Sequence, residues 1–130
     1  MFTFKKAERL SSKKDIEALF KNSSSLLVYP IKFSYRISET HVNIFPARVL
    51  VSVPKRNFKK AVDRNLLKRR IREAYRLIKP TFYKELHETK IDLQINFIGK
   101  EILDYAKIEQ AIKNGLHKIT LQLYKNSKSE

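Results

Sequence analysis

The stretch from Ala47 to Lys79 reads ARVLVSVPKRNFKKAVDRNLLKRRIREAYRLIK and contains the change of periodicity that defines the fold. Alternating apolar residues predict a strand over residues 47–53 with one buried face. After this strand, apolar residues recur at helical spacing: Leu67, Ile71, Ala74 and Ile78. We therefore expect a helix that begins between Asn57 and Asp63 and ends at Pro80, because proline lacks a backbone donor and clashes with the preceding turn.

The same reading extends to the rest of the chain. Alternation predicts strands over residues 31–37 and 91–98, with a short strand around Leu26–Tyr29. Ser12 and Asp15 resemble a capping box that opens a short helix, and a last helix is expected from near Asp104. The predicted order is α-β-β-β-α-β-α, an α+β two-layer sandwich of helices against a small mixed sheet.

Length and composition predict one domain and exclude several classes. The 130 residues are 42% hydrophobic, enough for a single core over residues 1–124, and residues 125–130 are expected to form a frayed polar tail. The absence of cysteine excludes disulfide scaffolds, thiol nucleophiles and Cys-ligated metal sites. Gly99 and Gly115 are isolated, so no glycine-rich phosphate loop is present. No export signal or long apolar run appears, so we expect a cytoplasmic protein without a membrane span.

Positive charge is concentrated in one segment. The net charge is +15, and residues 55–79 hold eleven Lys or Arg against two acids, Asp63 and Glu73. Like charges repel in a compact state, so this excess indicates a polyanionic partner: nucleic acid, an anionic membrane surface or an acidic protein.

The spacing of these cations distinguishes between the possible partners. Arg64, Lys68, Arg72 and Arg76 form one stripe on the predicted helix, beside Asn65 and Arg69. A helix face that is merely solvated would carry acidic residues one turn away from its basic residues, so that the charges pair. Here only Glu73 is placed to form such a pair. A membrane-surface helix would present bulky apolar residues and would not be framed by strands. Guanidinium groups suit phosphate oxygens, so nucleic acid is the favoured partner.

A longer motif covers this segment. Residues 51–56 read VSVPKR and residues 61–73 read AVDRNLLKRRIRE, which together resemble the signature of the bacterial ribonuclease P protein component. Glu8-Arg9-Leu10, followed by Asp15 and Phe20, is similar to the opening of that family. The sequence departs from the family pattern at three positions, with Leu66 in place of an arginine, Ile16 in place of an aromatic residue and Pro54 in place of a small polar residue.

The resemblance implies a fold and a function. In that family a small basic protein joins a catalytic RNA that removes the 5′ leader from precursor tRNA, and the fold has a left-handed β-α-β crossover. The resemblance implies that this chain contributes no catalytic residue and binds no metal in the absence of the RNA. It also implies that the RNA holds most of the Mg²⁺ and that the free protein is a monomer. Its partners are the catalytic RNA and precursor tRNA. The residues expected to contact RNA are Lys55, Arg56, Lys60, Arg64, Asn65, Lys68, Arg69, Arg72 and Arg76.

Aromatic residues are the candidates for stacking unpaired leader bases. These are Phe20, Phe33 and Tyr35, although aromatic residues on an alternating strand commonly belong to a core. The family holds the leader in a cleft between the sheet and the first helix.

Other residues indicate no catalytic site. The histidines, His41, His87 and His117, are scattered, and the aspartates stand singly, as expected of surface residues, caps and ion pairs. A structural ribosomal protein or other RNA-binding protein without a processing role is the alternative, because this fold also occurs among ribosomal proteins. A nuclease that acts without RNA is a third hypothesis.

Overall fold

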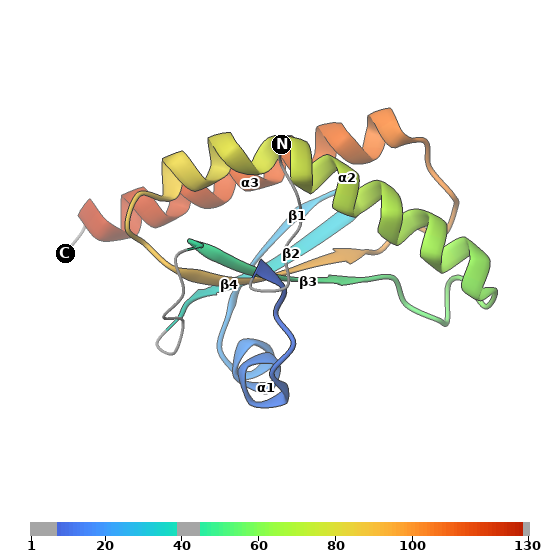
Figure 1. The fold of residues 1–130 in the computed structure, drawn as a ribbon, viewed down its shortest axis with the longest axis horizontal. Helices are drawn as coiled ribbons and strands as arrows, with labels where there is room; N and C mark the ends of the chain where they lie inside the picture. Colours follow the sequence, from blue (N-terminus) through green and yellow to red (C-terminus); the bar gives the residue numbers. More distant parts are fainter. Residues whose placement is uncertain (1–7, 39–44, 129–130) are drawn as a thin grey trace.

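The computed structural model describes residues 8–38 and 45–128, and the order of its elements confirms the predicted α+β class. The elements are α1 (Lys13–Lys21), β1 (Ser24–Val28), β2 (Ile31–Ile37), β3 (Ala47–Ser52), α2 (Ala61–Leu86), β4 (Ile91–Phe97) and α3 (Tyr105–Lys128). Figure 1 shows that α2 and α3 cover one face of the sheet, whereas α1 lies on the opposite side. Residues 1–6 and His41 lie outside the described residues.

The sheet is mixed, as predicted. Its strand order is β1-β2-β4-β3, with β2 antiparallel to both β1 and β4, and β3 parallel to β4. Helix α2 connects the two parallel strands, and the resulting β-α-β crossover is left-handed (Figure 1). This connection brings the beginning of α2 to the same end of the molecule as the end of β3.

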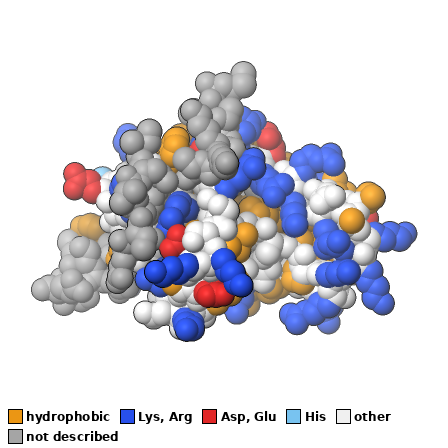
Figure 2. Space-filling view, turned by 60° about the horizontal axis from the view of Figure 1, so that its bottom comes forward, with side chains coloured by type: hydrophobic (Ala, Val, Ile, Leu, Met, Phe, Trp, Pro, Cys, Tyr) orange, Lys and Arg blue, Asp and Glu red, His pale blue; other side chains and the backbone are white. Residues whose placement is uncertain are grey.

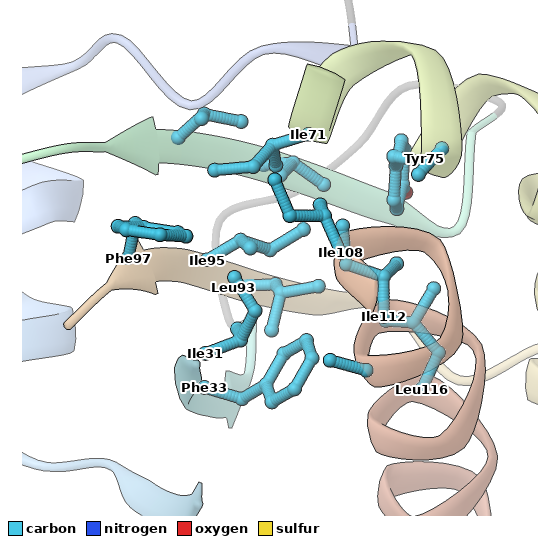
Figure 3. Packing of buried hydrophobic residues seen from close by; sticks show 14 of the residues in the cluster. Ile31, Phe33, Ile71, Tyr75, Leu93, Ile95, Phe97, Ile108, Ile112 and Leu116 are labelled. Atoms are coloured by element: carbon cyan, nitrogen blue, oxygen red, sulfur yellow. The ribbon is translucent and has the colours of Figure 1, made fainter. Parts of the chain in front are cut away.

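The core lies between the sheet and the two long helices. On β2 and β4, Phe33, Leu93 and Ile95 are fully buried and face Ile108 and Ile112 of α3 (Figure 3). The apolar residues that define the predicted helix are also buried, except Ile78, which is half-buried. The alternation of each strand therefore leaves its other side chains on the face where α1 lies.

The helix starts follow local capping chemistry. The backbone N–H of Asp15 donates to Ser12 Oγ at 3.4 Å, which confirms the predicted start of α1. Asp104 Oδ1 accepts from the backbone N–H of Lys107 at 3.0 Å, directly before α3. Helix α2 begins at Ala61, and the side chain at its N-cap position, Lys60, makes no capping hydrogen bond.

The predicted end of α2 at Pro80 is wrong. The helix continues to Leu86 with Pro80 inside it. Phe82 and Leu86 are buried beyond the proline, and the rings of Tyr75 and Phe82 lie 6.3 Å apart across it. Burial of this last part of the helix outweighs the hydrogen bond that proline removes.

Other element boundaries differ from the predictions by a few residues. Helix α3 continues to Lys128, well into the stretch expected to be a polar tail, because neither proline nor glycine follows Gly115 to end it. Strand β1 begins at Ser24 rather than near Leu26. No helix in the described part of the chain is long and apolar enough to cross a membrane.

A buried ionic cluster attaches the first described residues to α2. Glu8 is fully buried, and both of its carboxylate oxygens accept hydrogen bonds from Lys79 Nζ at 2.8 Å. The hydroxyl of Tyr83 also donates to Glu8, and it lies 3.3 Å from the hydroxyl of Tyr75. Lys79, one of the eleven cations of residues 55–79, therefore belongs to this buried cluster and not to the surface.

Candidate nucleic-acid interface

The first half of α2 separates an apolar side from a cationic side. Leu67, Ile71 and Ala74 are fully buried against the sheet and α3. The remaining positions carry the predicted stripe, and Figure 2 shows Lys and Arg side chains crowded at the end of the molecule where α2 begins. The core thus fixes the rotation of the helix about its axis, which fixes the direction in which the cations project.

Two residues of this stripe and the two beside it have no partner within the described part of the chain. Asn65, Lys68, Arg69 and Arg72 make no side-chain hydrogen bond or ion pair with any described residue. Asn65, Arg69 and Arg72, with Glu73 and Arg76, line an open hollow of about 370 Å³ on the helix surface. Unneutralised guanidinium groups around a solvent-filled hollow are suited to anionic oxygens.

Arg64 has a structural role within the protein, and its predicted contact with RNA stays a prediction. Its Nη1 donates to the backbone carbonyls of Phe58 and Lys59, at 2.8 and 2.9 Å. Phe58 is buried, and its ring lies 5.8 Å from that of Phe97. Arg64 therefore shapes the connector between β3 and α2, and this use of its donors was not visible in the helical spacing.

That connector carries the flanking cations. Lys55, Arg56 and Lys60 are exposed at the end of the molecule where β3 stops and α2 begins. They extend the cationic surface of α2 along the chain, as the sequence predicted. We call the surface formed by Lys55, Arg56, Lys60, Asn65, Lys68, Arg69 and Arg72 the α2 cationic surface.

Arg76 and Arg70 are engaged within the protein. Arg76 Nη2 lies 2.5 Å from Glu73 Oε1, and this hydrogen bond raises the pKa of Arg76 and lowers the pKa of Glu73. Arg70 Nη1 donates to the backbone carbonyl of Leu103 at 2.6 Å, which joins α2 to the loop before α3. Leu66, which stands in place of the family arginine, is half-buried and supplies no charge.

The sheet face on the α1 side is polar. Arg48 on β3 binds Asp92 on β4 and Asp15 on α1, with its Nη1 3.1 Å from Asp15 Oδ2. Farther along the strands, Gln94 Nε2 donates to Ser52 Oγ at 3.0 Å, and Ser52 Oγ donates to Asn96 Oδ1 at 2.8 Å. One ionic and one neutral polar cluster thus lie on the same face.

The aromatic candidates are divided by burial. Phe20 on α1 is 60% exposed, so its ring is open to a base. Phe33 and Tyr35 are 0% and 3% exposed; Phe33 points toward α3 (Figure 3), and the hydroxyl of Tyr35 donates to Gln122 on α3. The structure therefore corrects the prediction for these two residues, because neither ring has a free face. The alternation along β2 could have shown this, since the polar residues that alternate with the two aromatic residues mark the face on the α1 side: Lys32, Ser34 and Arg36.

The other candidate residues form no reactive cluster. His117 Nδ1 lies 3.5 Å from Glu85 Oε2 at the surface, and His87 is exposed at the end of α2. Within residues 8–38 and 45–128, no group of three His, Asp or Glu residues could hold a metal ion. Asp15, Asp92 and Asp104 serve in the ion pairs and cap described above.

A small α+β domain that buries one side of a basic helix and exposes several cations on the other has the features of a nucleic-acid-binding protein. The sequence profile of the family described as Ribonuclease P matches residues 4–120. The ribonuclease P protein component of Porphyromonas gingivalis is 36% identical over 120 residues, covering 91% of this chain and 87% of that protein. That of Petrotoga mobilis is 34% identical over 120 residues, covering 90% and 95%. The chain belongs to the ribonuclease P protein component family.

Solved structures agree on the fold. The RNase P protein of Staphylococcus aureus superimposes with a TM-score of 0.68 at 23% identity, covering 88% of this chain and 95% of that one. The RNase P protein of Thermotoga maritima also gives 0.68, at 24% identity, covering 85% and 96%. At these identities the similarity establishes the fold.

Proposed function

We propose that this protein is the protein subunit of ribonuclease P, that it binds the catalytic RNA through the α2 cationic surface, and that it assists 5′ maturation of precursor tRNA. The observation that carries the proposal is a set of four neighbouring residues on α2 that lack partners among the described residues: Asn65, Lys68, Arg69 and Arg72. Family membership supplies the identity of the RNA.

In this proposal the protein provides charge and position, and the RNA provides the chemistry. Enzyme RNA and substrate RNA repel each other, and a protein of net charge +15 offsets that repulsion. The RNA cleaves the substrate and holds most of the Mg²⁺. The free protein is a monomer in the cytoplasm, and it holds no metal by itself.

The leader of precursor tRNA is assigned to the sheet face on the α1 side. Phe20 is the stacking candidate that remains after Phe33 and Tyr35 are removed, and the amides of Gln94 and Asn96 lie on the same sheet face. Stacking on an exposed ring tolerates any base, so this contact favours the presence of a leader rather than its sequence.

Reconstitution tests the proposal. The parent protein is combined with the catalytic RNA of the same organism at low Mg²⁺, and cleavage is compared for precursors with a long leader and a one-nucleotide leader. We expect the protein to accelerate cleavage by the catalytic RNA, with the greater effect on the precursor that has the long leader. Without the catalytic RNA, we expect the protein to cleave neither precursor. Cleavage by protein alone, or co-purification with ribosomal RNA only, would contradict the proposal.

A salt titration tests the α2 cationic surface. The double variant Arg69→Ala/Arg72→Ala should bind the RNA more weakly and with a slope of log affinity against log salt that is lower by about 2. The matched control is Lys113→Ala/Lys118→Ala, which removes two exposed charges from α3. Equal slopes for both variants would contradict the assignment of the interface.

A further inference from the structure

A second hollow lies away from α1 and the polar sheet face. Its volume is about 370 Å³, and it opens between the β1–β2 turn and the beginning of α3. Its lining includes Tyr29, Pro30, Leu103, Lys107, Gln110 and Asn114. None of these side chains belongs to the α2 cationic surface or to the polar sheet face.

Two separate chain segments line this hollow, and a third holds one of them in place. The backbone N–H of Ile98 donates to the carbonyl of Pro30 at 2.9 Å, which holds the β1–β2 turn against the end of β4. Lys107, Gln110 and Asn114 are spaced along one side of α3 and line the hollow together. The hollow therefore belongs to the packed domain and not to a single loop.

The lining combines three kinds of group that recognise a nucleotide. Tyr29 is 65% exposed, so its ring offers an open face for stacking. The amides of Gln110 and Asn114 each provide donors and an acceptor for a base edge. Lys107 provides a cation for a phosphate. Within the described part of the chain, the side chains of these four residues have no hydrogen-bonding or ionic partner.

One hydrogen bond joins helix α2, which carries most of the α2 cationic surface, to the lining of the hollow. Arg70 on α2 donates to the carbonyl of Leu103, which lines the hollow. Figure 1 shows the loop before α3 rising at the end of the molecule where α2 begins. Glu101 and Asp104 on this loop partly balance Lys100 and Lys107, so stacking, rather than charge, is the main attraction that the hollow offers.

We propose that this hollow is a second RNA site that takes one unpaired nucleotide, with the base stacked on Tyr29 and its edge facing Gln110 and Asn114. The choice of RNA as the ligand rests on the proposed function. An RNA that contacts the α2 cationic surface reaches the hollow by passing the loop at Leu103. The hollow anchors the RNA by a contact that does not depend on charge.

Binding of the catalytic RNA to Tyr29 variants tests this site. Tyr29→Ala should weaken binding about 5- to 10-fold, toward the lower end of the range for loss of one stacked base, with an unchanged salt slope because no charge is lost. Tyr29→Phe keeps the ring and should bind like the parent protein. Tyr124→Ala removes another exposed tyrosine, 59% exposed on α3, and serves as the matched control. Thermal unfolding verifies that each variant is folded.

Crosslinking identifies the source of the nucleotide. Catalytic RNA and precursor tRNA, each carrying 4-thiouridine, are irradiated separately with the parent protein and the catalytic RNA. A crosslink to the Tyr29 peptide in either experiment supports the site and names its RNA. Wild-type affinity of Tyr29→Ala for both the catalytic RNA and precursor tRNA, or crosslinks confined to other peptides, overturns the site even where Arg69→Ala/Arg72→Ala weakens binding. A parent protein that binds no RNA overturns the proposed function, and this site with it.

Discussion

Arg48 on β3 binds both carboxylate oxygens of Asp92 on β4, with Nε 2.8 Å from Oδ1 and Nη2 3.0 Å from Oδ2. The same guanidinium reaches Asp15 on α1 and Ser38 at the end of β2. Burial alone lowers the pKa of Arg48, but its interactions with Asp92 and Asp15 outweigh burial and raise it. One side chain thus joins two strands to the helix that carries Phe20.

Removing this guanidinium should destabilise the protein strongly. Asp92 has a side chain only 4% exposed, so Arg48→Met leaves a buried carboxylate without its counter-charge, at a cost of about 3–5 kcal/mol in the free energy of unfolding. Urea denaturation measures the change. Lys32→Met, an exposed change on β2, is the control and should have little effect. A loss below about 1 kcal/mol, typical of a surface ion pair, would show that the pair is not buried in solution.

Gly115 allows α3 to approach β2, and a methyl group there should not fit. A Cβ at this position would lie 2.0 Å from Phe33 Cε2, inside a fully buried ring contact. Gly115→Ala should therefore lower stability by about 1–3 kcal/mol, although alanine is the better helix former. Adding Phe33→Leu should recover part of the loss. Independent, additive effects of the two substitutions would contradict direct contact.

The protein should lose stability at alkaline pH because three tyrosines have raised pKa values. Burial raises the pKa of Tyr75 and Tyr83 well above the usual value near 10, and burial together with the nearby charge of Glu109 raises the pKa of Tyr105 to about 12. Because the folded state keeps these protons longer than the unfolded state, their contribution to stability is complete below pH 10 and declines as the pH rises further.

Ultraviolet absorbance of tyrosinate follows this titration, with urea denaturation performed at each pH. Tyr75→Phe should retain more of its stability than the parent protein between pH 10 and 12. Identical alkaline declines for the variant and the parent would mean that Tyr75 ionises normally in the folded protein.

Arg64 and Arg69 should separate stability from RNA binding. Arg64→Ala removes two hydrogen bonds to the connector and should cost about 1–2 kcal/mol of stability, as well as weakening RNA binding. Arg69→Ala should weaken RNA binding with no measurable loss of stability, since Arg69 is exposed and has no partner among the described residues. Calorimetry measures the stability of both variants, and filter binding measures their affinity for RNA. Equal unfolding temperatures for the two variants would exclude a role of Arg64 in stabilising the connector.

The elements that could be predicted are those with a strong local period. Alternation in β2, β3 and β4 and helical spacing from Leu67 to Ile78 were confirmed, because burial of one face imposes these patterns. The end of α2 was not predictable, since Pro80 is a strong local stop signal that packing of Phe82 and Leu86 overrides.

The sequence predicts which charged segment forms the candidate site, but not which of its side chains are bound within the protein. Charge density identified the α2 cationic surface, whose described members are exposed or half-buried. No local pattern distinguishes Arg64, held by carbonyls of the connector, from Arg69, which has no described partner. The buried Glu8–Lys79 pair was equally invisible, because it joins residues 71 apart in the chain.

That separation has a consequence for how the molecule is assembled during synthesis. A ribosome adding about 5–20 residues per second takes about 4–14 s to reach Lys79 after making Glu8. Throughout that interval the buried ion pair cannot form, because Lys79 and Tyr83, which bind this carboxylate in the folded protein, have yet to be made. Glu8 thus reaches its native surroundings only after the 71 residues that follow it, up to Lys79, have been made.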